Sequence, residues 1–183
     1  IEEPQPVGQI RKLEKLLGQI KQGGTYNPIW DVQVICAVNR KSELSRKTLN
    51  DRLQGLLNPR GKTAGDNPFR VGDKIINTKN NWIVPLNPYD IDDSLMRGGK
   101  VFVANGEIAS VLDVAPKYTV ARLEFPLREI RIPRGRQDLT EESDEDEGTG
   151  CAWSLAYAIS GHKMQGSQNK IIIVMVDESP GAR

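Results

Sequence analysis

The stretch Leu155–Asn169, LAYAISGHKMQGSQN, decides how the rest of the chain is interpreted. An apolar run of strand character leads into Ser160–Lys163 and then into Gln165–Gln168. A second apolar run, Ile171–Val176, comes next. Small, polar and basic side chains between two runs with the composition of buried strands are typical of a phosphate-binding loop at the edge of an α/β sheet.

The composition is that of a soluble globular protein, with 183 residues of which 38% are hydrophobic and 27% charged. No apolar run has the length of a membrane span, and the first residues do not form a secretion signal. We therefore expect a cytoplasmic protein with no membrane partner. Cys36 and Cys151 lie far apart and outside any CxxC pattern, which predicts two reduced, mostly buried thiols.

The net charge of +1 conceals a division of charge along the chain. The run Asp138–Glu147 holds seven of the 24 acidic residues and no basic one, which leaves 17 acidic against 25 basic residues elsewhere. This basic surplus favours a polyanionic partner. We predict that residues 138–149 form an acidic disordered loop, with mimicry of nucleic-acid phosphates as an alternative role.

The first 60 residues carry two helix patterns, Val7–Gln22 and Leu44–Leu57, and one strand pattern between them, Asp31–Val38. The nearly continuous Val and Ile content of the strand suits the centre of a parallel sheet. Arg40 and Lys41 follow it in a polar turn. Strand, basic turn and helix together make half of a βαβ unit.

The sequence Gly61-Lys62-Thr63 does not form a P-loop, because Leu56 stands where that motif needs glycine and a helix pattern precedes it. We interpret Arg60–Pro68 as a linker at a domain boundary. Short strand patterns begin at Phe69, and Asn105-Gly106 is a strong hairpin signal between two of them. Residues 69–137 are therefore predicted to form a small inserted antiparallel barrel.

Four segments in this order resemble the C-terminal half of superfamily 1B DNA helicases of the RecD-like type, and together they cover most of the chain. VQVICAVNRKSELSRKTLNDRLQGLLNP resembles the entry to the family's second RecA-like domain. FRVGDKIINTKNNW with VFVANGEIASVLDV resembles its inserted SH3-like barrel. AYAISGHKMQGSQ resembles helicase motif V, roughly AYAITVHKSQGSE in the family, and IIIVMVD resembles the strand after it.

The resemblance implies an α/β fold in which a RecA-like parallel-sheet domain of the P-loop NTPase type is interrupted by the SH3-like barrel. Residues 1–60 and 150–183 would form this second motor domain, which is incomplete. The implied activity is that of an ATP-dependent DNA helicase using ATP and Mg²⁺. Its partners would be single-stranded DNA, or a junction of single and double strands, and an N-terminal motor domain of the same protein.

The chain has no Walker A loop, no Walker B acid pair and no arginine-bearing motif VI. We therefore expect it to supply one wall of the ATP cleft, to contain no catalytic residue and to be inactive alone. One histidine and no CxxC give no metal-ligand pattern. Mg²⁺ would be held by the missing domain and the nucleotide.

The resemblance also implies which residues form the sites. The implied DNA-binding residues are Ser160, His162, Lys163, Gln165, Asn81 and Trp82. The implied nucleotide-binding residues are Arg40, Lys41, Gly166, Ser167 and Gln168. Ser160, Gly161 and Gln168 depart from the family's Thr, β-branched residue and Glu.

Several residues have alternative structural roles. Arg40 could solvate its turn, His162 could be a structural histidine and Trp82 could lie in the barrel core. Two alternative functions are a non-catalytic module that binds nucleic acid or protein through a degenerate RecA-like domain, and a barrel used mainly for protein docking.

Overall fold

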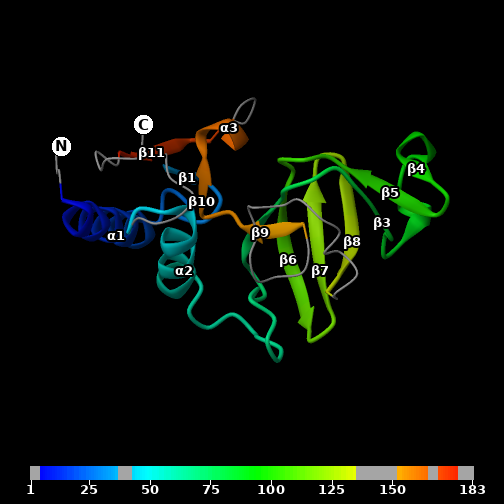
Figure 1. Ribbon diagram of the computed structural model, residues 1–183, viewed down its shortest axis with the longest axis horizontal. Coiled ribbons are helices and arrows are strands. Elements are labelled where there is room, and N and C mark those ends of the chain that lie inside the picture. The colour runs from blue at the N-terminus through cyan, green and yellow to red at the C-terminus, as the bar shows by residue number, and fades with distance from the viewer. Residues whose placement is uncertain (1–4, 37–42, 135–151, 165–168, 177–183) are drawn as a thin grey trace. The chain divides into compact units, whose positions relative to one another are not determined.

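The computed structural model describes residues 5–36, 43–134, 152–164 and 169–176 of the chain. These residues fall into two compact units (Figure 1). We call Ile1–Pro59 with Tyr157–Arg183 the parallel unit, and Arg60–Ala156 the antiparallel unit. The acidic run, Arg40, Lys41 and residues 165–168 lie outside the described residues.

The parallel unit is built on a three-stranded sheet in the order β10-β1-β11. The central strand β1 (Val32–Cys36) pairs in parallel with β10 (Ala158–Ser160) and β11 (Ile171–Met175). Val32, Val34 and Cys36 are buried, as a strand covered on its faces requires. The prediction of a central parallel strand between residues 31 and 38 is confirmed.

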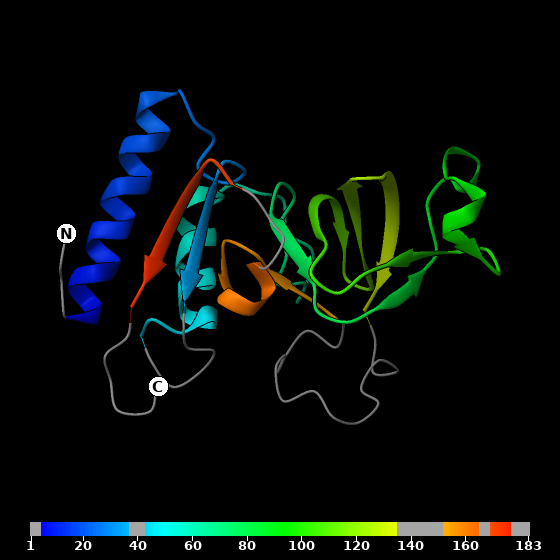
Figure 2. The same cartoon turned by 90° about the horizontal axis from the view of Figure 1, so that it is seen from above.

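Two helices run alongside this sheet, α1 (Pro6–Gly23) and α2 (Arg46–Leu57), as Figure 2 shows. Helix α1 is capped by Gly24, whose φ of 69° is left-handed, a conformation that glycine adopts without steric cost. Helix α2 begins after Ser45, whose hydroxyl oxygen accepts a hydrogen bond from the Thr48 N–H at 3.3 Å. Each helix buries three apolar side chains, Ile10, Leu13 and Leu17 in α1 and Leu49, Leu53 and Leu57 in α2, whereas Leu16 of α1 is 41% exposed.

The antiparallel unit contains eight strands among its described residues, in two sheets. The larger sheet has the order β8-β7-β6-β2-β9, and the smaller has the order β3-β5-β4. Two short 3₁₀ helices, Pro88–Asp90 and Asp93–Leu95, lie between β3 and β4. The strands are β2 (Lys74–Asn77), β3 (Asn81–Ile83), β4 (Met96–Arg97), β5 (Lys100–Val103), β6 (Ile108–Ala115), β7 (Tyr118–Glu124), β8 (Leu127–Pro133) and β9 (Trp153–Leu155).

These observations confirm the α/β fold class, with a parallel sheet interrupted by antiparallel sheets. Strand pairing among the described residues forms two sheets joined by a bridge between Pro85 and Ile130. It does not describe one closed barrel, so the SH3-like barrel stays a prediction. No helix in the described part of the chain has the length and apolarity needed to cross a membrane.

The stretch 153–159 differs from its prediction as one apolar run of the parallel-sheet domain. Trp153–Leu155 pairs with β2 in the antiparallel unit, whereas Ala158–Ser160 pairs with β1 in the parallel unit. The Ala156 N–H donates to the Lys74 carbonyl oxygen at 2.8 Å, and the Tyr157 carbonyl oxygen accepts from the Val34 N–H at 3.3 Å. The physical reason is the Trp153 side chain, which is 1% exposed within the antiparallel unit.

The Asn105-Gly106 turn forms, but its flanking strands do not make the predicted hairpin. Gly106 has a φ of 92°, while β5 and β6 belong to different sheets. The end of β2 takes the place of the hairpin partner. Gly106 N–H donates to the Asn77 carbonyl oxygen at 2.8 Å, and Asn77 N–H donates to the Glu107 carbonyl oxygen at 2.9 Å.

We expect Trp153→Ala to lower the free energy of unfolding by about 3–5 kcal/mol, the usual cost of removing a buried aromatic ring. Trp82→Ala should change it by less than about 1 kcal/mol, because surface substitutions have small effects and this residue is 44% exposed. Urea unfolding of both variants followed by circular dichroism measures the difference. Equal losses in the two variants would contradict the burial assignment.

Candidate functional site

The first candidate site lies at the carboxyl edge of the parallel sheet. Strands β1 and β10 run in the same direction and end at the paired residues Cys36 and Ser160. Loops that leave neighbouring parallel strands at this edge are where α/β sheets bind ligands. Arg40 follows the end of β1 by four residues, and the predicted phosphate-binding segment follows β10 directly. The structure thus brings together the starting points of the two predicted segments.

The segment after β10 begins with the short helix α3 (Gly161–Met164). Ser160 and Lys163 are half-buried, and His162 lies in the same turn of helix. A Cβ atom added at Gly161 would meet nothing within 4 Å, so packing does not demand glycine here. Gln165, Gly166, Ser167 and Gln168 lie outside the described residues, and their roles stay predictions.

Asn50 of α2 fixes the strand that leads into this segment. Its Nδ2 donates to the Ala158 carbonyl oxygen and its Oδ1 accepts from the Ala158 N–H, both at 2.9 Å. Among the described residues β10 is an edge strand, paired on one side with β1. The buried Asn50 amide supplies the donor and acceptor that a neighbouring strand would supply.

A second buried amide, Gln33 of β1, holds the same strand from its other side. Its Nε2 donates to the Tyr157 carbonyl oxygen at 3.2 Å and to the Val34 carbonyl oxygen at 3.2 Å. Nearby, burial raises the pKa of the Cys36 thiol, whose Sγ lies 3.7 Å from the Ile159 carbonyl oxygen. The thiol therefore stays protonated at neutral pH and contributes packing rather than nucleophilicity.

Sequence analysis did not identify Asn50 or Gln33 as important for this site. The available signal was a polar amide inside an apolar pattern. Asn50 lies beside Leu49 on the buried face of α2, and Gln33 stands between Val32 and Val34. Such amides indicate a buried hydrogen-bond partner, because burying an amide without one is costly.

The second candidate site lies in the antiparallel unit, around Trp82. Trp82 is 44% exposed and lies opposite Phe102 across the β3–β5 pair. The two ring centroids are 5.3 Å apart with planes inclined at 57°. The alternative that Trp82 lies in the core is therefore wrong, and Trp153 is the buried tryptophan of this unit.

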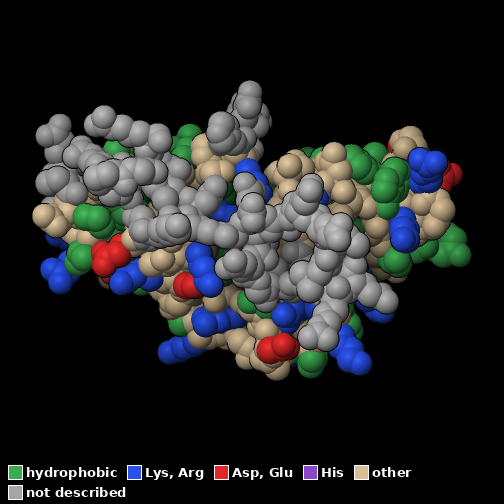
Figure 3. Space-filling view, in the orientation of Figure 1, with side chains coloured by type: hydrophobic (Ala, Val, Ile, Leu, Met, Phe, Trp, Pro, Cys, Tyr) green, Lys and Arg blue, Asp and Glu red, His purple; other side chains and the backbone are tan. Residues whose placement is uncertain are grey.

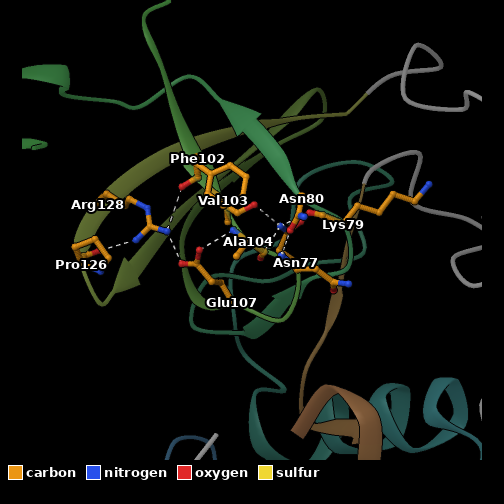
Figure 4. A network of polar contacts seen from close by, with 10 residues as sticks. Asn77, Lys79, Asn80, Phe102, Val103, Ala104, Glu107, Pro126 and Arg128 are labelled. Atoms are coloured by element: carbon orange, nitrogen blue, oxygen red, sulfur yellow. Dashed lines mark hydrogen bonds and ion pairs between the residues drawn. The ribbon is translucent and has the colours of Figure 1, made fainter. Parts of the chain in front are cut away.

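Asn81 adds an internal hydrogen bond to a network of polar contacts around Asn77, and Figure 4 shows that network. Its Nδ2 donates to Asn77 Oδ1 at 3.0 Å. The fully buried Asn77 in turn donates from Nδ2 to the Val103 and Ala104 carbonyl oxygens, at 3.1 and 2.9 Å, and to the Lys79 carbonyl oxygen. A DNA contact by Asn81 stays a prediction, and the contact observed positions the start of β3.

The same network includes an ion pair between Arg128 and Glu107. The Arg128 guanidinium also donates to the Pro126 carbonyl oxygen at 2.8 Å and to the Phe102 carbonyl oxygen at 3.4 Å. Glu107 Oε1 accepts a hydrogen bond from the Ala104 N–H at 2.6 Å. These bonds fix the backbone at Phe102 and at Ala104.

No model of a known protein family and no curated protein matches the sequence. The fold is similar to solved structures of Pif1 helicases. One is Pif1 from Bacteroides in complex with ADP-AlF3 and ssDNA, with 18% identity, a TM-score of 0.49 and coverage of 92% of this chain and 40% of that one. Another concerns DNA unwinding at forked dsDNA by two coordinating Pif1 helicases. It has 21% identity and a TM-score of 0.48, and the match covers 92% of this chain and 38% of that one.

A third is Bacteroides Pif1 bound to ssDNA, with 16% identity and a TM-score of 0.44, where the match covers 94% of this chain and 45% of that one. The chain thus spans about two fifths of the length of the first solved structure.

We expect Asn50→Asp to lower the free energy of unfolding by about 2 kcal/mol at neutral pH, because a carboxylate cannot donate to the Ala158 carbonyl oxygen. Burial beside that oxygen raises the pKa of the introduced carboxyl group in the folded protein. The loss is therefore present above this pKa and is relieved as the pH falls below it, where the protonated group donates again. Urea unfolding at several pH values measures the effect.

The matched control is Asn80→Asp, because the hydrogen bond observed for Asn80 uses only Oδ1, which accepts from the Asn105 N–H at 2.8 Å. This variant should keep nearly all of its stability at neutral pH. Equal losses in the two variants, or an Asn50→Asp loss that does not change with pH, would contradict the role given to Asn50.

Proposed function

We propose that the chain is the C-terminal part of an ATP-dependent DNA helicase or translocase of the RecD-like superfamily 1B type. In this proposal it contributes contacts to single-stranded DNA and one wall of the ATP cleft. The observation that carries the proposal is the pairing of Cys36 with Ser160. It supports the proposal because β1 and β10, which precede the basic turn and the motif V-like segment in the sequence, end side by side at the carboxyl edge of a parallel sheet.

The donor set of this edge suits phosphate groups. A hydroxyl at Ser160 and an ammonium at Lys163 are appropriate partners for the phosphates of a DNA strand, and we assign His162 and Gln165 to the same strand. Gly166, Ser167 and Gln168 would face the nucleotide. Arg40 and Lys41 would reach its phosphates from the end of β1. These two groups of residues would link DNA contact to nucleotide contact through one short segment.

ATP fits the residues predicted for this edge, since their hydroxyl and cationic groups are complementary to an anionic triphosphate. Mg²⁺ does not fit them, because it prefers carboxylate and water oxygens and none of the predicted residues carries a carboxylate. The described residues also contain no group of three or more His, Cys, Asp or Glu side chains suited to a metal. We therefore assign no part of the proposed activity to a metal held by this chain.

The buried amides of Gln33 and Asn50 support a coupling role for the segment. They hold the backbone just before Ser160 from both sides, so the strand that precedes the segment is fixed. If DNA binding displaces the segment, the loop after Ser160 would then move while strand β10 keeps its position in the sheet. The proposal is thus that the loop transmits binding between the two ligands and performs no bond chemistry itself.

The isolated chain should hydrolyse no ATP above background in the presence of Mg²⁺ and single-stranded DNA, because it has no Walker A or Walker B residues. It should nevertheless bind single-stranded DNA with an affinity that falls as salt rises. A phosphate-release assay and fluorescence anisotropy measure the two properties. Measurable turnover from the isolated chain would contradict its assignment as one wall of the cleft.

In the full-length protein, Lys163→Ala combined with Gln165→Ala should lower DNA-stimulated ATPase activity by about tenfold or more, the scale of losing one or two charge-assisted contacts. The matched control is Lys170→Ala. The ammonium of Lys170 pairs with Asp31 at 3.0 Å at the opposite, amino edge of the sheet, so its loss should leave stimulation nearly unchanged. Unchanged stimulation in the double variant would overturn the motif V assignment.

A further inference from the structure

One face of the three-stranded sheet β3-β5-β4 combines aromatic and cationic side chains. Side chains alternate between the two faces of a strand, and in β5 the buried Val101 and Val103 point to the core. Lys100 and Phe102 therefore share the outer face. Trp82 lies opposite Phe102 on β3, and Arg97 lies opposite Lys100 on β4. We call Trp82, Phe102, Lys100 and Arg97 the aromatic-basic face.

The aromatic-basic face is open to solvent. Trp82, Lys100 and Arg97 are exposed, and Phe102 is half-buried with its ring in contact with the Trp82 ring. Figure 3 shows hydrophobic and Lys or Arg side chains sharing the surface over β3, β4 and β5. The nearby acids are Asp92 and Asp93 in the turn before β4, and Asp92 Oδ1 accepts from the Ser94 N–H at 2.8 Å.

The backbone under this face is fixed by buried polar groups. Asn77 bonds the carbonyl oxygens of Val103 and Ala104, and Asn81 bonds Asn77 from the residue before Trp82. Arg128 bonds the carbonyl oxygen of Phe102 itself. An exposed aromatic pair held on a rigid sheet loses little conformational freedom when it binds a flat ligand, because its backbone is already ordered.

We propose that the aromatic-basic face is a stacking platform for the bases of single-stranded nucleic acid. Trp82 would stack on a base with Phe102 supporting it, and Lys100 and Arg97 would attract the phosphates of the same strand. Sites for single strands combine these two elements, stacking on aromatic rings and a positive surface along the backbone. The inference rests on the proposed function, because the single-stranded DNA is the substrate of the proposed helicase. It adds Phe102, Lys100 and Arg97 to the DNA contacts expected from sequence.

The test compares two fluorescent single-stranded probes of about 15 nucleotides, near the upper site size of a small domain. One is oligo-dT, and the other has the same length and phosphates but abasic sites in place of bases. The 183-residue chain should bind oligo-dT more tightly than the abasic probe in fluorescence anisotropy. Trp82→Ala should weaken oligo-dT binding about 5- to 150-fold, the range expected for losing one stacked base, and leave the abasic probe nearly unchanged.

Two further variants separate stacking from charge. Trp82→Phe keeps an aromatic ring and should retain most of the preference for oligo-dT. Arg97→Gln combined with Lys100→Gln should weaken the binding of both probes to the same extent. It should also reduce the slope of log affinity against log salt by about 1.4, or about 0.7 for each phosphate contact. The matched controls are Phe125→Ala, an aromatic residue 92% exposed elsewhere in the unit, and Lys117→Gln, an exposed lysine between β6 and β7.

Equal binding of the two probes, no binding of oligo-dT, or the same result for Trp82→Ala and Phe125→Ala would overturn the platform. The outcome is distinguishable from a failure of the proposed function. A full-length protein without DNA-stimulated ATPase, but with the preference for oligo-dT intact, would overturn the motor function and leave the platform. A full-length protein with DNA-stimulated ATPase activity, but with a preference for oligo-dT that does not depend on Trp82, would overturn the platform and leave the motor function.

Discussion

The two hydrogen bonds between the Asn50 amide and the backbone of Ala158 are the constraint on which the parallel unit depends. Strand β10 has only three residues and, in the described part of the chain, pairs with β1 alone, so the N–H and carbonyl oxygen of Ala158 need a partner outside the strand pairing. A helix side chain completes the pairing. The direction in which the chain leaves the sheet at Ser160 is thereby set by α2, a helix more than a hundred residues earlier in the sequence.

The antiparallel unit uses the same device at other places where regular pairing stops. Asn67 Nδ2 donates to the Ala115 carbonyl oxygen at 3.0 Å, to the Tyr118 carbonyl oxygen at 3.3 Å and to Thr119 Oγ1 at 3.0 Å. Asn77 does the same for the end of β5. An amide carries both donors and an acceptor, so it can satisfy divergent backbone groups at one position. Buried amides therefore join elements that have no ladder between them, in both units of this chain.

Local patterns predicted the elements well, and tertiary partners poorly. The Val and Ile content of β1 and the helix patterns of α1 and α2 are local signals, and the structure confirms these three elements. The stretch from Trp153 to Ile159 is apolar throughout, so hydrophobicity could not show that it divides between two sheets. Asn105-Gly106 likewise specified a turn but not the pairing of its flanks, which depends on Asn77. For the site, sequence located the segment after β10 but could not place the amides that position it.

The division of residues 153–159 has a mechanical consequence. Ala156 is hydrogen-bonded in the antiparallel unit and Tyr157 in the parallel unit, so no unpaired residue separates the two hydrogen-bonded networks at this passage. A tensile load applied along the chain at β9 would reach β10 across a single peptide bond, with no slack to absorb it. Shear-loaded strand hydrogen bonds and the Asn50 amide would resist that load together. The run from Leu155 to Ser160 thus passes directly from the pairing of β9 to the pairing of β10, just before the segment that carries Lys163.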